Sequence, residues 1–197
     1  MEAIDLAQRM VSELAVKPES GKDLGKPNDS RERLAVGVLD FSAALTQGIN
    51  FNSGLSMVLD AIYASMGFNR AVTFFRDAGI FKAKVGFGNR MPEALPMLTF
   101  PEACATDVFH LSTVNKADVF IQEITSSKAV SSIPDWLKEA LPDVDAFILL
   151  PLVFNGHAIC LIYADWRIGA AGTVEPSELS SMGMLRDYLM QALVKRE

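Results

Sequence analysis

The segment DAFILLPLVFNGHAICLIYADW, Asp145–Trp166, decides the fold class. It holds two long runs of β-forming residues, Ala146–Phe154 and Ala158–Trp166, with Asn155-Gly156 between them. Asn-Gly is the strongest two-residue signal for a hairpin, because both residues tolerate the positive φ angles of the turn. A hairpin makes its two strands antiparallel neighbours. The segment therefore predicts an antiparallel sheet and not a doubly wound parallel fold.

A second hairpin is predicted upstream of the first. Ala71–Arg76 and Ile80–Phe87 are both rich in β-forming residues, and the connection Asp77-Ala78-Gly79 is short and contains glycine. In the second run, the odd-numbered residues from Phe81 to Phe87 are apolar and alternate with Lys, Lys and Gly. This alternation predicts a strand with one solvated face.

Three long helices are predicted around these hairpins. The first begins near Ser30 and ends near Gly48; the second begins at Asn52 or Ser53 and ends at Gly67. The last begins after Pro176 and carries an apolar stripe of Leu and Met.

The middle of the chain is less regular. Asn89–Pro101 contains three prolines, which we expect to break any regular element. We expect short helices at Glu102–Leu111 and Ile133–Ala140, the latter capped by Ser132, and a short strand at Val119–Ile124 between them. The order of elements predicts an α+β fold with a central antiparallel sheet of five to six strands flanked by helices.

Composition narrows the class of protein. The chain has 197 residues, 50% of them hydrophobic, and a net charge of −6. This is the size of one domain. An acidic chain lacks the concentrated basic face that nucleic-acid binding needs, so no nucleic-acid partner is expected. The longest apolar run, Ala146–Phe154, is far shorter than the ~20 residues of a membrane-spanning helix, so no membrane partner is expected either.

The cysteines and histidines are few and scattered. Cys104 and Cys160 are too few for a secreted disulfide scaffold, and with His110 and His157 they do not form the close pairs typical of structural zinc sites. No metal site and no cofactor are therefore expected. Since the N-terminus also lacks the features of a signal peptide, a cytoplasmic location is predicted.

The N-terminal 29 residues differ from the rest of the chain in their sequence pattern. Met1–Val16 has the apolar spacing of an amphipathic helix, and the following residues, rich in Pro and Gly, read as a flexible linker. The sequence thus predicts a helix and linker over residues 1–29 and a domain over residues 30–197.

The pattern as a whole, from about Val38 to Lys195, resembles a GAF domain, the small sensory module related to PAS domains. The pieces that carry the resemblance are GLSMVLDAIYASMGF, NRAVTFFRD, IFKAKVGFG, ADVFIQEI, the Asp145–Trp166 hairpin and VEPSELSSMGMLRDYLMQAL, in that order. More faintly, the N-terminal helix resembles the tail of a bacterial HDOD regulatory domain. The resemblance implies that the chain could be the C-terminal part of a bacterial HDOD–GAF signalling protein.

Within the family, the known chemistries can be compared with this chain. Members that bind cyclic nucleotides carry Asn-Lys at the end of the last long strand, where this chain has Asp165-Trp166. Members that bind bilins carry a cysteine commonly beside a histidine, whereas Cys104 is six residues before His110. The enzymatic relative, free methionine sulfoxide reductase, uses several pocket cysteines; Cys104 lies in the corresponding region, but Cys160 reads as inert core.

In a GAF arrangement, residues 97–136 would fold over one face of the sheet and offer a small-molecule pocket. The candidate pocket residues are Phe100, Cys104, Asp107, Phe109, His110, Phe120 and Trp136. Aromatic residues of this kind also fit a filled core beneath a lid, and both interpretations stay open.

The resemblance also implies dimerisation through the terminal helices. The candidate interface residues are Leu34, Val38, Phe41, Met182, Leu185 and Leu189. The alternative is that the sheet covers all of this apolar stripe.

The leading interpretation is a non-enzymatic, intracellular sensory module that binds a small ligand, forms a homodimer, or does both. Two alternatives remain: a redox enzyme similar to free methionine sulfoxide reductase that uses Cys104, and a purely structural dimerisation domain with a filled pocket.

Overall fold

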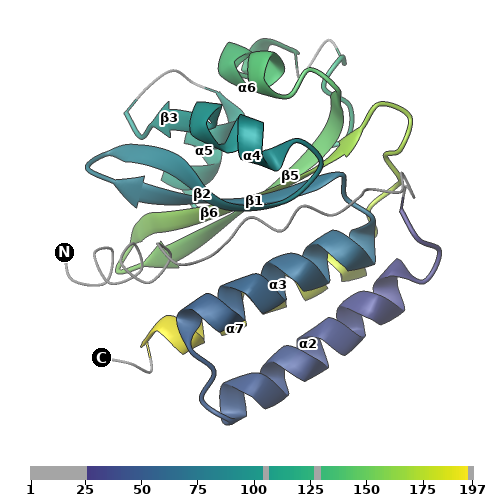
Figure 1. The fold of residues 1–197 in the computed structure, drawn as a ribbon, viewed down its shortest axis with the longest axis vertical. Coiled ribbons are helices and arrows are strands. Elements are labelled where there is room, and N and C mark those ends of the chain that lie inside the picture. Colours follow the sequence, from purple (N-terminus) through teal and green to yellow (C-terminus); the bar gives the residue numbers. More distant parts are fainter. Residues whose placement is uncertain (1–25, 104–106, 127–129, 195–197) are drawn as a thin grey trace.

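The computed structural model describes residues 26–103, 107–126 and 130–194. The predicted N-terminal helix, most of the linker and Cys104 lie outside these residues, so the division at residue 29 stays a prediction. The described residues form one sheet with helices on both of its faces (Figure 1). In this part of the chain, no helix is long and apolar enough to cross a membrane.

The sheet of the described residues has six antiparallel strands in the order β3-β2-β1-β6-β5-β4. The strands are β1 (Arg70–Asp77), β2 (Ile80–Gly88), β3 (Thr99–Pro101), β4 (Val119–Ile121), β5 (Val144–Phe154) and β6 (His157–Arg167). The predicted turn joins β5 to β6, and both Asn155 and Gly156 have positive φ. The predicted α+β fold with five to six antiparallel strands is confirmed.

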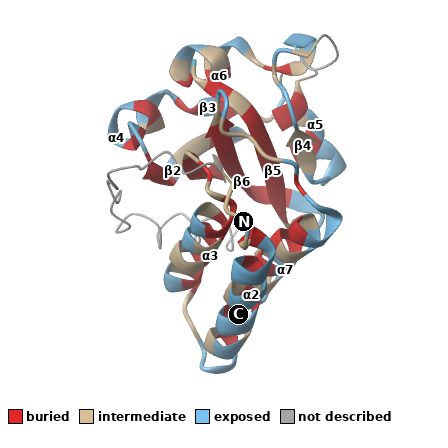
Figure 2. Ribbon diagram, turned by 90° about the vertical axis from the view of Figure 1, so that its right-hand side faces the viewer, coloured by how far each residue is buried: buried red, intermediate tan, exposed pale blue. Residues whose placement is uncertain are grey.

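Two groups of helices cover the sheet. The long helices α2 (Ser30–Thr46), α3 (Phe51–Met66) and α7 (Pro176–Val194) lie on one face; α3 and α7 contact the sheet, and α2 packs on α3 and α7 from outside. The short helices α4 (Met91–Ala94), α5 (Val108–Asn115) and α6 (Asp135–Ala140) lie on the other face, with 3-10 turns at Leu95–Met97 and Val130–Ser132. Figure 2 shows the sheet buried between the two groups.

The ends of α3 show how local sequence sets an element. Asn50 accepts a hydrogen bond from the Ser53 amide (2.9 Å), so the helix begins at Phe51, slightly before the predicted start. Gly67 ends the helix in the left-handed conformation (φ 61°), as predicted.

The predicted alternation along β2 is wrong in its second half. Thr73 pairs with Val85 and Phe74 with Ala83, so Lys84 is an extra residue in β2 and forms a β-bulge. Because a bulge shifts the alternation by one residue, Phe81 faces the short helices, whereas Val85 and Phe87 face α3. The strand therefore contributes to both cores.

The middle of the chain is more regular than its prolines suggested. Asn89–Pro101 contains α4, a 3-10 turn and the edge strand β3. Pro92 lies in the first turn of α4 and Pro101 in an edge strand, both places where proline is tolerated.

The remaining short elements are shifted from their predicted bounds. Helix α5 spans Val108–Asn115, because Asp107 caps its first turn and Lys116 ends it in the left-handed conformation. Helix α6 begins at Asp135 after Pro134, not after Ser132. Strand β4 ends at Ile121, three residues before the predicted end.

The six candidate interface residues lie inside the chain's own core. This core fills the space between the sheet and the long helices. Leu34, Phe41, Met182, Leu185 and Leu189 are fully buried, and Val38 is 8% exposed. The prediction that these side chains contact a second copy is therefore corrected, because the apolar stripes of α2 and α7 are covered by α3 and by the sheet.

Candidate functional site

The second core, between the sheet and the short helices, is dominated by aromatic rings. Seven rings, each from a different helix or strand, contact one another: Phe74, Phe81, Phe100, Phe109, Trp136, Phe147 and Tyr163. Phe109 on α5 lies at the centre of the cluster and is fully buried. Its ring centroid is 4.8 Å from that of Trp136 and 5.3 Å from that of Phe100. Among the described residues, rings thus fill the interior that a small ligand could have occupied.

An open pocket of about 430 Å³ lies at the edge of this cluster. Three of the predicted pocket residues line it: Phe100 from β3, Asp107 before α5 and Trp136 from α6. The rings of Phe100 and Trp136 stack at a centroid distance of 5.7 Å and an angle of 5°. The other lining residues are Pro101, Val130, Ser131, Ile133, Pro134, Asp135 and Lys138.

The charged groups around this pocket have different partners. Lys138 pairs with Asp135, one turn earlier on α6 (Nζ–Oδ1 3.1 Å). Asp107 accepts a hydrogen bond from the His110 amide at Oδ1 (2.9 Å) as the cap of α5. None of the ion pairs found among the described residues includes Asp107.

His110 comes three residues after Asp107 in the sequence, and it is not among the described residues that line the pocket. Its ring nitrogen Nδ1 is 2.8 Å from the carbonyl oxygen of Glu102. The Glu102 carboxylate in turn pairs with Arg76 on β1 (2.6 Å). The ring of His110 therefore contacts the backbone at Glu102 and is not directed into this pocket.

The other predicted pocket residues are not brought together. Phe120 lies on the opposite face of the sheet, where its ring contacts Trp166. Cys104 lies outside the described residues. Cys160 is fully buried in the core next to the long helices, and burial raises the pKa of its thiol well above the ordinary value. A buried neutral thiol is a poor nucleophile.

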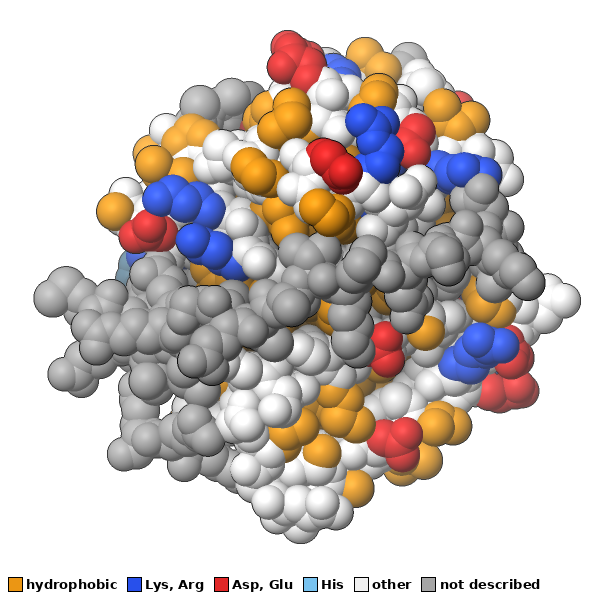
Figure 3. Space-filling model, viewed as in Figure 1, with side chains coloured by type: hydrophobic (Ala, Val, Ile, Leu, Met, Phe, Trp, Pro, Cys, Tyr) orange, Lys and Arg blue, Asp and Glu red, His pale blue; other side chains and the backbone are white. Residues whose placement is uncertain are grey.

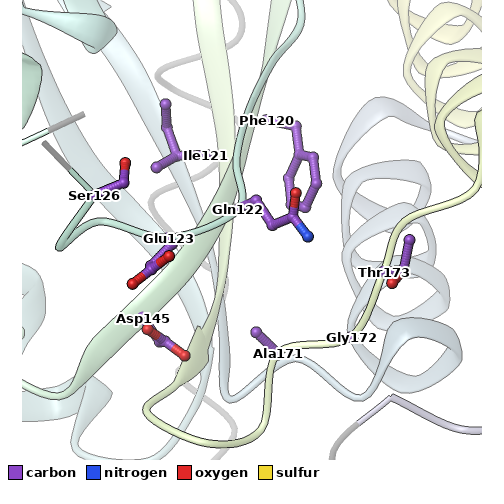
Figure 4. A pocket seen from close by; sticks show the side chains of 9 residues that line it. All are labelled: Phe120, Ile121, Gln122, Glu123, Ser126, Asp145, Ala171, Gly172 and Thr173. Carbon is purple, nitrogen blue, oxygen red and sulfur yellow. The ribbon is translucent and has the colours of Figure 1, made fainter. Parts of the chain in front are cut away.

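A second pocket, of about 570 Å³, lies beside β4 (Figure 4). Figure 4 shows the carboxyl groups of Glu123 and Asp145 on one side and the segment Ala171–Thr173 across from them. Phe120 also lines this pocket and a third one of about 580 Å³ toward α7. Sequence reasoning missed both pockets, because their walls come from segments far apart in the chain.

Buried charges join β1 to the end of β6. The Arg70 guanidinium donates to Asp165 (Nε to Oδ2 2.9 Å) and pairs with Asp143 (2.8 Å). Tyr163 donates its hydroxyl to Asp165 (2.6 Å). Burial raises the pKa of Asp165 to about 6, although Arg70 and Tyr163 favour the carboxylate. Tyr163 is also one of the seven rings, so this network of charged groups adjoins the aromatic cluster.

Glu178, in the first turn of α7, has specific partners in two parts of the chain. It is 1% exposed and accepts hydrogen bonds from Lys26 (2.6 Å), from the Ser30 hydroxyl (2.5 Å) and from the Glu175 amide (2.8 Å). Burial alone would raise the pKa of Glu178, but these donors outweigh it and lower the pKa. Glu178 thus connects the start of α7 to Ser30 at the start of α2 and to Lys26, which precedes α2.

The surface charge is mixed. On the face seen in Figure 3, described Lys and Arg side chains are interspersed with Asp and Glu instead of gathering in one stripe.

Comparison of the sequence with protein-family models and with curated proteins gives no match. Solved structures do match. The GAF domain of a phosphoenolpyruvate-protein phosphotransferase from Acinetobacter has a TM-score of 0.63 at 10% identity, over 86% of this chain and 95% of that one. The GAF domain of a putative sensor histidine kinase from Pseudomonas syringae has a TM-score of 0.56 at 14% identity, over 85% and 91%. The chain has a GAF fold.

The GAF fold is also found in enzymes. Free methionine-R-sulfoxide reductase from Neisseria meningitidis, solved with its substrate, has a TM-score of 0.65 at 11% identity, over 91% of this chain and 95% of that one. At these identities the structural similarity establishes the GAF fold alone. An activity has to be argued from the residues of the site.

Proposed function

We propose that this GAF-fold chain is a non-enzymatic sensory or regulatory module that responds to a small molecule in the pocket of Phe100, Asp107 and Trp136. The observation that carries the proposal is an open pocket of about 430 Å³ against the aromatic cluster. Its volume is within the range of small-molecule sites, and aromatic side chains with a few charged groups are typical of such sites.

The pocket joins elements that are separate in the chain. Its walls come from β3, from the residue that caps α5 and from α6 with the turn before it. A ligand that contacts all three would stabilise one arrangement of these elements relative to others, which is a shift of population.

A path of contacts leads from this pocket to the long helices. Trp136 contacts Phe109, and Phe109 stacks on Tyr163 of β6 (6.0 Å). On the same strand, Trp166 faces the other core and donates its indole hydrogen to the carbonyl oxygen of Met66 at the end of α3 (3.0 Å). Strand β6 therefore touches both the ligand side and the helix side of the molecule.

The test is a thermal-shift screen of metabolites on the full chain and on Trp136→Phe. We expect at least one compound to raise the melting temperature of the unaltered chain, because a ligand that binds only the folded state stabilises it. The same compound should have a smaller effect on Trp136→Phe and an unchanged effect on Leu111→Ala, a change on the exposed side of α5. A screen without any stabilising compound would favour a structural module with a filled pocket.

The enzymatic alternative has support from the reductases that share the fold. Within the described residues, Cys160 is buried and unreactive, which leaves the mechanism without a second thiol there. We expect no reduction of free methionine-R-sulfoxide in the presence of a thiol reductant. Turnover that disappears in Cys104→Ser would contradict the non-enzymatic assignment.

Dimerisation through a terminal helix is the second part of the proposal, at a surface different from the predicted one. Val36 and Leu39 on α2 are 54% and 69% exposed, and their helical positions are opposite the buried stripe of this helix. With the exposed Ala43 they have the i, i+3, i+7 spacing of one helix face. This face supports pairing with α2 of a second copy.

A further inference from the structure

We infer that the pocket of Phe100, Asp107 and Trp136 selects an organic cation, a small molecule with an ammonium group on an apolar body. The inference rests on the proposed function, since it names the class of ligand for the same pocket. It is carried by two features of the lining: the balance of its charges and the chemistry of its aromatic wall.

The balance of charges favours a positive ligand. Among the described lining residues, two carry a carboxylate and one an ammonium group: Asp107, Asp135 and Lys138. The ammonium group of Lys138 is already paired with Asp135, its neighbour on α6. Within the described part of the lining, the carboxylate of Asp107 therefore carries the charge that no ion pair balances.

Asp107 is held in place by its role in the backbone. Its oxygen Oδ1 accepts the His110 amide hydrogen, and this bond fixes the side chain at the start of α5. A carboxylate can accept several hydrogen bonds, so the cap leaves further acceptor capacity for a ligand. The geometry thus supplies a fixed negative group without a Lys or Arg in ion-pair contact among the described residues.

The aromatic wall favours the same class of ligand. The indole of Trp136 is partly exposed and lines the pocket, whereas the buried ring of Phe100 is stacked between Phe81 and Trp136 and supports the indole from behind. The faces of aromatic rings attract cations, indole most strongly, and recognition of quaternary ammonium groups commonly uses such rings. The apolar lining residues Val130, Ile133 and Pro134 would contact the body of the ligand.

The experiment compares three probes of the same shape and different charge on the full chain. The probes are choline, its neutral isostere 3,3-dimethylbutan-1-ol and the anion 3,3-dimethylbutanoate, with binding measured by calorimetry and by tryptophan fluorescence. The chain has two tryptophans, and Trp166 is fully buried, so a change in quenching by the probe reports on Trp136. We expect choline to bind at least tenfold more tightly than either isostere.

Two substitutions complete the test. Asp107→Asn keeps the cap of α5, since Asn and Asp cap helices about equally well, but removes the charge. We expect this variant to bind choline about tenfold more weakly and the neutral isostere unchanged. Asp40→Asn, an exposed change on α2 far from the pocket, should bind choline as the unaltered chain does.

The outcomes separate the inference from the proposed function. Equal or tighter binding of the neutral or anionic isostere, or an Asp107→Asn variant with full affinity for choline, would overturn the inference. Failure of choline to bind, while the metabolite screen finds a neutral or anionic ligand sensitive to Trp136→Phe, would overturn the inference and leave the proposed function standing. If no compound binds in either experiment, both fail.

Discussion

Glu178 illustrates how one side chain can join parts of the chain that are far apart. It is the buried acceptor for Lys26, for Ser30 at the start of α2 and for the first turn of its own helix α7. Lys26 also donates to the carbonyl oxygen of Thr173 (2.5 Å), so the residues that lead into α2 lie against the loop before α7. Hydrogen bonds of Lys26 and Ser30 therefore connect the start of α2 directly to the first turn of α7.

We predict that Glu178→Gln destabilises the fold at neutral pH by about 1–3 kcal/mol, the cost of weakening hydrogen bonds to a charged group. Because the pKa of Glu178 is lowered by folding, its contribution is present above the ordinary value of 4.5 and is lost as the pH falls through the lower folded value. Chemical denaturation at several pH values measures this.

The matched control is Glu175→Gln, an exposed change at the same end of α7. It should leave stability nearly unchanged at all pH values. A Glu178→Gln variant that stays equally destabilised at pH 7 and well below pH 4 would show that shape, and not charge, explains the effect.

At the scale of elements, the β1–β2 pair depends on one glycine and one bulge. Gly88 ends β2 with φ 109°, and a Cβ atom there would lie 2.1 Å from the carbonyl oxygen of Asn69. The bulge at Lys84 sends Phe81 to the aromatic cluster and Val85 to the core under α3. A strand with strict alternation could not supply both cores.

We predict that Gly88→Ala is more destabilising than Gly79→Ala, measured by thermal or urea unfolding. Gly79 in the β1–β2 turn also has positive φ (80°), but a Cβ atom there would meet nothing within 4 Å. Its substitution should therefore cost only the backbone strain, about 1–2 kcal/mol. Gly88→Ala adds a backbone clash, and equal costs for the two variants would show that the strand end relaxes freely.

At the scale of the whole molecule, the sheet separates the three long helices from the aromatic cluster and the candidate pocket. The apolar stripes of the long helices cover the sheet and one another, which leaves the outer face of α2 exposed (Figure 2). A signal from the pocket would have to cross the sheet, and the two faces of β6 provide the contacts for this.

We predict that Leu39→Glu weakens self-association of the full chain, because it places charge on the exposed apolar face of α2. Sedimentation equilibrium over a range of concentrations measures the dimer. Leu111→Glu, an exposed change of the same kind on α5, should leave it unaffected. If Leu39→Glu associates as the unaltered chain does, the α2 face is not the interface.

Local sequence determined much of this protein. The Asn155-Gly156 turn, the caps at Asn50 and Gly67, and the helix after Pro176 could be predicted because each depends on the conformational preferences of a few adjacent residues. These signals were sufficient for the antiparallel α+β fold. The resemblance to GAF domains, and not these local signals, placed Phe100, Asp107 and Trp136 among the candidate pocket residues.

Only the tertiary structure decided which faces these elements present. Phe120 lies on the opposite face of the sheet from Phe100, and Leu185 and the other candidate interface residues are buried in the chain's own core. The partners of Glu178 depend on contacts between segments that the sequence does not place side by side, and the bulge at Lys84 depends on a single extra residue in a strand. The sequence by itself thus determined the long helices, the two hairpins and their order, whereas packing between distant segments decided which aromatic rings fill the core and which border an open pocket.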